Sequence, residues 1–133
     1  MLKKIVSAKL AGNIVLTILM LMLLLHLLIL TQVIPPSFVW GGRLEAFSGE
    51  VLSLEMISLL VTLMFLIFIA AKVGYILNKK YNFITNIGVW IMFIYFTLNV
   101  FMNLASNSTT EKIIFTPITI ILALLTFRLA IEK

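Results

Sequence analysis

Residues 10–34 read LAGNIVLTILMLMLLLHLLILTQVI, and this stretch decides the class of the fold. The run is longer than the roughly 20 apolar residues that a helix needs to cross about 30 Å of hydrocarbon. It is also longer than the apolar core of a signal peptide, which has about 7–15 residues, and no small-residue cleavage site follows it. Pro35 and Pro36 come next, and a pair of prolines cannot continue a helix. The stretch therefore predicts a membrane-spanning helix that ends just before Pro35.

Three further apolar runs follow, at about residues 51–77, 84–104 and 113–131. Unpaired backbone polar groups are costly in hydrocarbon, so each run is expected to be a helix. The runs also lack the alternation of apolar and polar residues that strands of a membrane β-barrel show. The sequence predicts an all-α integral membrane protein: one domain, residues 1–133, forming a bundle of four transmembrane helices with a longer loop after the first.

The composition agrees with a membrane protein and excludes several other classes. Of the residues, 62% are hydrophobic and 11% are charged, whereas soluble domains have about 45–50% and about 25%. The net charge of +5 comes from Lys and Arg at the edges of apolar runs, which indicates membrane orientation rather than nucleic-acid binding. Cysteine is absent, which excludes disulfides, thiol catalysis and Cys-based metal sites. Membrane lipids are the expected partners, and nucleic acid is not expected.

The distribution of Lys and Arg predicts the orientation. With the N-terminus in the cytoplasm, only Arg43 and Lys112 of the 10 basic residues lie on the outer side. Short loops that carry an excess of Lys and Arg face the cytoplasm. We therefore expect a multi-pass protein of a bacterial inner or plasma membrane with both termini cytoplasmic. The inner side would then carry Lys3, Lys4, Lys9, Lys72, Lys79, Lys80, Arg128 and Lys133.

Small and weakly polar residues at helical spacing predict the faces that pack, because such residues let helices approach closely in lipid. On the first helix, Asn13, Thr17 and Thr31 share one face and His26 points away from it, so this helix either packs on two sides or meets another subunit. Trp90 falls opposite the packing face of the third helix. The predicted packing faces of the later helices are Glu55, Ser58 and Thr62; Gly88, Met92, Tyr95, Asn99 and Asn103; and Thr116, Thr119, Ala123, Thr126 and Ala130.

Polar side chains in the outer half of the membrane form one candidate ligand-binding site. They can enclose a chamber that opens outward and holds a small amphipathic molecule or relays a proton. They can equally form hydrogen bonds between helices that only fix the packing. One His and one Glu are too few for a zinc site, and no Gly-x-Ser-x-Gly motif is present, so no catalytic residue, metal or cofactor is expected. The candidate residues are His26, Arg43, Glu55, Ser58, Asn99, Asn103 and Thr119.

The first outer loop carries the most distinctive tetrapeptide, residues 40–43 (WGGR). Its glycines allow a tight turn, after which residues 44–48 are predicted to form a short helix on the membrane surface. Trp40 and Phe38 suit an anchor at the membrane interface. Arg43 is placed to reach Glu55 across the mouth of the chamber or to meet a lipid phosphate.

The start of the last helix carries a capping signal and a proline. Ser108 is followed three residues later by Glu111, which matches a capping box. Pro117 then falls inside the helix or at its first position, so a modest kink is expected near Thr116.

These features favour a non-enzymatic bundle that serves as an accessory or oligomeric subunit, in a homo-oligomer or a larger membrane complex. The alternative is a binder or carrier of a small lipophilic or cationic molecule, which the outward polar cluster supports. A membrane-embedded enzyme that modifies lipids is the third hypothesis.

Overall fold

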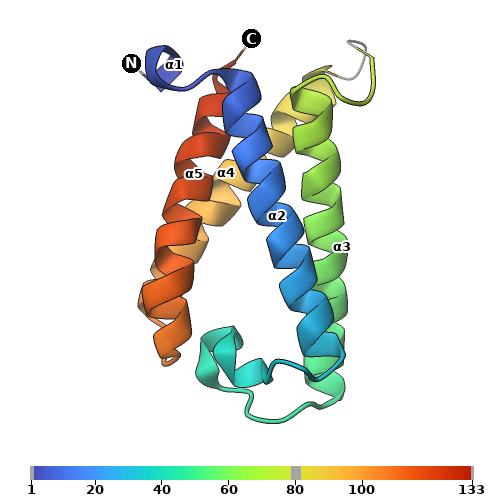
Figure 1. Ribbon diagram of the computed structural model, residues 1–133, viewed down its shortest axis with the longest axis vertical. Coiled ribbons are helices and arrows are strands. Elements are labelled where there is room, and N and C mark those ends of the chain that lie inside the picture. Colours follow the sequence, from blue (N-terminus) through green and yellow to red (C-terminus); the bar gives the residue numbers. More distant parts are fainter. Residues whose placement is uncertain (1, 79–81, 133) are drawn as a thin grey trace.

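The computed structural model describes residues 2–78 and 82–132, and within these ranges the chain forms helices and no strands (Figure 1). A four-residue helix, α1 (Leu2–Ile5), precedes the bundle. Two short 3-10 turns, η1 (Pro36–Phe38) and η2 (Trp40–Gly42), lie in the first long loop. The long helices are α2 (Ala8–Leu30), α3 (Gly49–Lys72), α4 (Asn82–Leu104) and α5 (Thr116–Ala130), the last preceded by a π-helical segment, η4 (Glu111–Phe115).

In the described part of the chain, four helices are long and apolar enough to cross a membrane: Ala8–Leu30, Gly49–Lys72, Asn82–Leu104 and Glu111–Ala130, the last of which joins η4 to α5. The predicted all-helical architecture with four such segments is confirmed at this level. Helices α2 and α3 end before their apolar runs do, because the chain turns in a left-handed conformation at Gln32 and at Gly74. Gly74 has φ +85°, and the N–H of Tyr75 bonds to the carbonyl of Ala70, as in a Schellman motif.

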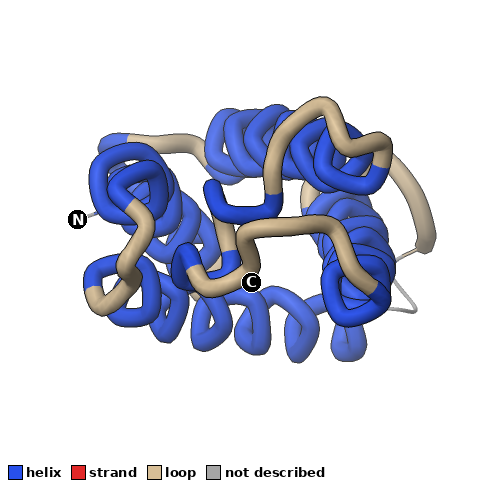
Figure 2. Tube along the Cα trace, turned by 90° about the horizontal axis from the view of Figure 1, so that it is seen from below, coloured by secondary structure: helices blue, strands red, loops and turns tan. Residues whose placement is uncertain are grey.

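The long helices form a ring in which each packs against two others: α2 against α3 and α5, and α4 against α3 and α5 (Figures 1 and 2). One end of the bundle, here called the terminal end, carries both chain ends and the connection from α3 to α4. The opposite end, here called the loop end, carries the loop of residues 31–48 and the α4–α5 connection, residues 105–110. In Figure 1, α2 and α5 lie close together at the terminal end and diverge toward the loop end.

The tightly packed core therefore lies nearer the terminal end. It combines side chains from all four long helices, and apolar packing there removes the space between α2 and α5. Its fully buried members include Ala11, Val15, Ile69, Val89, Met92 and Leu129. A cavity lies toward the loop end, among the polar residues.

The predicted packing face of α5 is largely confirmed. Thr116, Thr119, Thr126 and Ala130 are buried along the α5 segment, while Ala123 is half-buried. The hydroxyl of Thr126 bonds to the carbonyl of Leu122 in its own helix, so the methyl group is left to pack. Leu122 lies off the predicted face and is nevertheless buried.

On α4, Gly88, Met92 and Asn103 are buried as predicted, but Tyr95 is 43% exposed. Trp90, predicted on the opposite side, is 37% exposed. On α2 the face with Asn13, Thr17 and Thr31 is exposed, and His26 turns toward the other helices.

Candidate functional site

Glu55 lies in α3 and is fully buried. Ser48 begins this helix, because its hydroxyl accepts a hydrogen bond from the N–H of Val51. Atom Oε2 of Glu55 lies 2.6 Å from Nδ1 of His26 in α2, and Oε1 accepts a 2.6 Å hydrogen bond from Nε1 of Trp40 in the loop. A buried carboxylate is tolerated where donors satisfy both oxygens. Glu55 thus ties α2, α3 and the loop together.

Trp40 is the member of this cluster that the sequence did not suggest. It was predicted to be an interfacial anchor, whereas its indole turns back toward the bundle and is only partly exposed. Its φ is +58°, a left-handed conformation that is uncommon for a bulky residue. Phe38 does keep an exposed side chain.

The prediction of a short helix over residues 44–48 is wrong. The helical turns occur earlier, as η1 and η2, and residues 43–48 form no helix. The physical reason is that Ser48 must be extended, with φ −146° and ψ 174°, to cap α3. The Pro35–Pro36 pair favours the tight turn of η1, since proline presets the φ angle that opens a 3-10 turn.

Three hydrogen-bonded contacts join this loop to the α4–α5 connection and to Glu111 at the start of η4. The N–H of Gly41 donates to both carboxylate oxygens of Glu111, at 3.3 and 3.1 Å. The carbonyl of Gly41 accepts from the N–H of Asn107 at 3.2 Å, and the hydroxyl of Ser108 donates to the carbonyl of Phe38 at 3.1 Å. Gly42 permits the approach: its φ is +69°, and a Cβ there would lie 3.1 Å from the Ser108 nitrogen. Figure 2 shows the loop lying across the loop end of the bundle.

Only half of the predicted capping box forms. The hydroxyl of Ser108 accepts from the N–H of Glu111 at 3.4 Å, as expected. The Glu111 side chain does not return to Ser108, whose N–H instead donates to the hydroxyl of Ser106. The carboxylate is used across the two loops at Gly41. Glu111 therefore belongs to the site, whereas the sequence predicted for it only a role in capping the last helix.

The irregularity expected near Thr116 takes the form of η4, the π-helical segment before it. Both the N–H and the hydroxyl of Thr116 bond to the carbonyl of Glu111, which replaces the usual α-helical pattern. Pro117 has no N–H to donate, so the regular α-helical hydrogen bonds of α5 cannot extend back through the turn before it. π-Helical turns are frequent at functional sites, and this one begins at Glu111.

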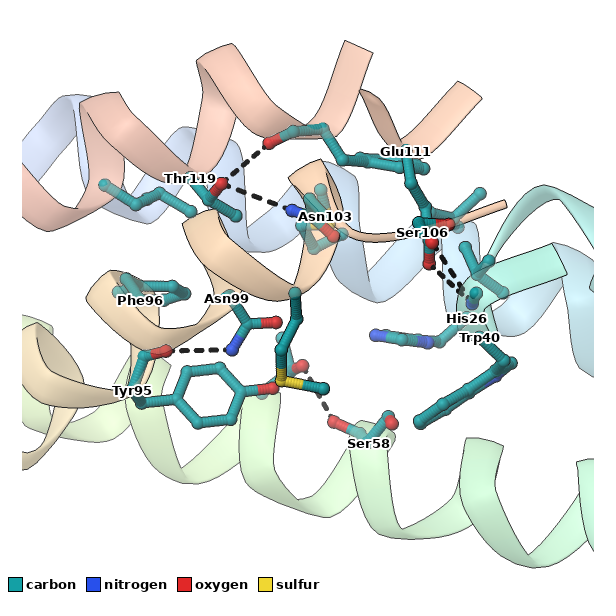
Figure 3. A pocket seen from close by; sticks show the side chains of 18 of the residues that line it. His26, Trp40, Ser58, Tyr95, Phe96, Asn99, Asn103, Ser106, Glu111 and Thr119 are labelled. Carbon is teal, nitrogen blue, oxygen red and sulfur yellow. Dashed lines mark hydrogen bonds between the residues drawn. The ribbon is translucent and has the colours of Figure 1, made fainter. Parts of the chain in front are cut away.

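A cavity of about 440 Å³ lies between the helices at the loop end (Figure 3). The loop residues Val39, Trp40, Gly41 and Arg43 form part of its wall. Its apolar wall includes Leu19, Val61, Phe65, Phe96, Phe115 and Leu122.

Six of the seven predicted site residues line this cavity: His26, Arg43, Ser58, Asn99, Asn103 and Thr119. Glu55 does not line it and lies behind His26 and Trp40. It therefore positions groups that face the cavity rather than facing it directly.

Arg43 does not pair with Glu55 in the part of the chain that the structure describes. Its side chain is exposed and lies beside Gly41, where a Cβ would be 3.6 Å from Nε of Arg43. Trp40 occupies the oxygen of Glu55 that an arginine would need. The expected contact between Arg43 and Glu55 is therefore not formed.

The amides on α4 are held by defined partners. Nδ2 of Asn99 donates to the carbonyl of Tyr95 at 2.8 Å. Nδ2 of Asn103 donates to the hydroxyl of Thr119 at 3.2 Å, and that hydroxyl bonds to the carbonyls of Phe115 and Thr116. These bonds fix the orientation of both amides toward the cavity.

The arrangement suits non-covalent binding. Within residues 2–78 and 82–132, no group of three or more His, Cys, Asp and Glu side chains is placed to hold a metal ion. The wall instead combines apolar surface with a few oriented polar groups, as ligand pockets do.

Comparisons of the chain with models of known protein families, with curated proteins and with solved structures found no match.

Proposed function

We propose that the chain is an integral membrane protein that crosses the bilayer four times, with both termini in the cytoplasm. Large apolar side chains cover the outside of the bundle, among them Leu21, Ile57 and Ile94, each more than half exposed. An apolar surface of this extent fits lipid as the surrounding solvent. The excess of Lys and Arg near the terminal end supports a cytoplasmic location for that end. Of the residues that carry this argument, Lys79, Lys80 and Lys133 lie outside the described part of the chain.

We propose further that the protein binds a small amphipathic molecule in the cavity at the loop end. The observation that carries this proposal is the convergence of six predicted polar residues, from four helices and a loop, around one space with apolar walls. Its volume, about 440 Å³, falls within the roughly 300–1,000 Å³ of small-molecule pockets. An apolar tail would contact Phe65, Phe96 and Leu122, and a polar head would meet His26 and the amides.

The cavity supports ligand binding over the alternative in which the polar residues only fix the packing. Hydrogen bonds between helices need no open space, and protein interiors normally close-pack around them. Here Asn103 bonds to Thr119 between α4 and α5, yet both residues still line the cavity. Packing alone gives no reason for the space to remain.

Filling the cavity tests this function. Val61 lines the cavity from α3, whereas its neighbour Leu60 is 62% exposed. Val61→Phe should abolish the binding of decyl amphiphiles to the protein in lipid nanodiscs, measured by native mass spectrometry. Leu60→Phe, the matched control, should bind as the wild type does. Equal binding by both variants, or no one-to-one binding by the wild type, would refute the proposed function.

A second candidate function is that of a homo-oligomeric subunit, and the exposed face of α2 favours it. The residues of this face follow the alternating three- and four-residue spacing by which helices pack side by side. The proposed occupant is α2 of a second copy, because the same face can pair with itself. Leu24→Cys should then form disulfide-linked dimers in membranes, and Ile57→Cys on α3 should not; equal cross-linking would reject this interface. The exposed face consists of Leu10, Asn13, Thr17, Met20, Leu24, Leu27 and Thr31.

A further inference from the structure

The hydrogen bonds around the cavity determine which atom of each polar side chain remains to meet a ligand. Glu55 accepts a hydrogen bond from Trp40 on one oxygen, and His26 lies against the other. An ionised carboxylate can only accept, so Nδ1 of His26 must carry a proton. In the neutral imidazole, Nε2 is then an acceptor. His26 lines the cavity, and Nε2 has no hydrogen-bond partner among the described residues.

The two amides on α4 lead to the same result. The carbonyl of Tyr95 can only accept, so the atom of Asn99 that bonds to it must be the amide nitrogen. The hydroxyl of Thr119 uses its one hydrogen on the backbone of α5, so Asn103 must likewise donate through nitrogen. The carbonyl oxygens Oδ1 of Asn99 and Oδ1 of Asn103 have no hydrogen-bond partner among the described residues. Each amide therefore presents its carbonyl oxygen as an acceptor, beside the second N–H of its nitrogen.

Two N–H donors on the wall are already used. The indole N–H of Trp40 is bonded to Glu55, and the N–H of Gly41 is bonded to Glu111. The hydroxyls of Ser58 and Tyr95 can donate or accept, so they adapt to either kind of ligand. Arg43 is a fixed donor, but it is exposed on the loop rather than deep in the bundle. The deep part of the cavity thus offers a ligand three acceptors: Nε2 of His26 and the amide oxygens of Asn99 and Asn103.

Charge favours an ammonium over a neutral donor. The buried carboxyl group of Glu55 lies directly behind the imidazole of His26. Glu111 adds a second buried carboxylate on the wall. The rings of Phe65 and Tyr95, with centroids 5.2 Å apart, also line the space, and aromatic rings attract cations.

We propose that the cavity selects an amphipathic molecule whose head donates hydrogen bonds and carries positive charge, that is, a lipophilic primary amine. This inference rests on the proposed binding function and names its ligand class. His26, Asn99 and Asn103, which are labelled in Figure 3, accept from the ammonium. Glu55 sets the direction of the His26 hydrogen bond without touching the ligand.

Four decyl compounds test the inference, with native mass spectrometry of the protein in nanodiscs as the readout. Decylamine should bind roughly tenfold or more tightly than 2-decanone, which has a head that only accepts; tenfold corresponds to about 1.4 kcal/mol. Decanol should fall between them. Decyltrimethylammonium keeps the charge without a donor and should also bind more weakly than decylamine. Preference for 2-decanone, or equal binding of all four, would overturn the inference.

The variant Glu55→Gln tests directly whether Glu55 sets the direction of the His26 hydrogen bond. The oxygen of the introduced amide can still accept from Trp40, while its N–H₂ donates to Nδ1 of His26. The imidazole proton then moves to Nε2, which becomes a donor toward the cavity. The variant should fold normally but lose the preference for decylamine and gain affinity for 2-decanone. Glu50→Gln, at an exposed glutamate in the first turn of α3, is the matched control and should keep the wild-type order.

The outcomes separate the two proposals. If no decyl compound binds, or if Val61→Phe does not prevent binding, the proposed function fails. If the compounds bind in the cavity but Glu55→Gln leaves their order unchanged, the binding function stands and the donor-selective site is rejected. Should Glu55→Gln not fold, the wild-type order of the four compounds still decides the inference.

Discussion

Nε1 of Trp40 lies 2.6 Å from Oε1 of Glu55, although the first residue belongs to a loop and the second to the interior of α3. The left-handed conformation of Trp40 turns the indole back toward the bundle. The other oxygen of Glu55 lies against His26, so neither carboxylate oxygen is left without a neighbouring donor. This relationship holds the loop over the cavity and also orients the imidazole that faces it.

Removing the indole N–H should destabilise the protein. Trp40→Phe keeps an aromatic ring but leaves one oxygen of the buried Glu55 without its donor. An unsatisfied buried polar group costs about 1–3 kcal/mol, so we expect a lower melting temperature in detergent. Trp90→Phe, at a partly exposed position of α4, should change the melting temperature little. Similar melting of the two variants would contradict a structural role for the Trp40–Glu55 hydrogen bond.

Loss of the Glu111 carboxylate should release the loop from the α4–α5 connection. The chain has two tryptophans, so Trp90→Phe leaves Trp40 as the single fluorescent reporter of the loop. In that background, Glu111→Ala should shift the emission to longer wavelength and increase quenching by acrylamide, because Gly41 loses its acceptor. Glu45→Ala removes an exposed carboxylate from the same loop and should leave both signals unchanged. An unchanged spectrum in Glu111→Ala would show that this contact does not hold the loop.

The proposed orientation can be tested with single cysteines, because the chain has none of its own. Ala46 and Thr109 are exposed at the loop end, and Asn78 and Asn82 are exposed near the terminal end. In intact cells, an impermeant maleimide should label Cys introduced at 46 and 109, and label positions 78 and 82 only after permeabilisation. The reverse pattern would place the terminal end outside.

Enlarging a buried residue on the packing face of α5 should lower stability. Thr126 is fully buried, and its hydroxyl is bonded within its own helix. Thr126→Leu adds volume to a packed site, and overpacking typically costs about 1–3 kcal/mol. Leu124→Ile, at a position that is 53% exposed, is the control and should melt near the wild type. Leu122 would be unsuitable as a control, because it is buried despite lying off the predicted face. If both variants melt alike, α5 does not pack through this face.

The helices and most residues of the candidate site could be predicted from the sequence, because both depend on local patterns. Apolar runs of spanning length leave helix as the only conformation that satisfies the backbone in lipid. Polar residues in the outer half of those runs identified His26, Ser58, Asn99 and Asn103, all of which line the cavity. The small residues of α5 marked its buried face for the same reason.

Which atoms meet was decided only by the tertiary structure. Trp40 and Glu111 looked like a membrane anchor and a helix cap, since local signals say nothing about partners far along the chain. The path of residues 36–42 brings Trp40 to Glu55 and Gly41 to Glu111, and it leaves Arg43 apart from the carboxylate. That path depends on left-handed turns and contacts between two loops, which no periodicity encodes. The sequence by itself determined the helices and the polar lining of the cavity, and the loop fold determined which groups of that lining are held and which are left to bind.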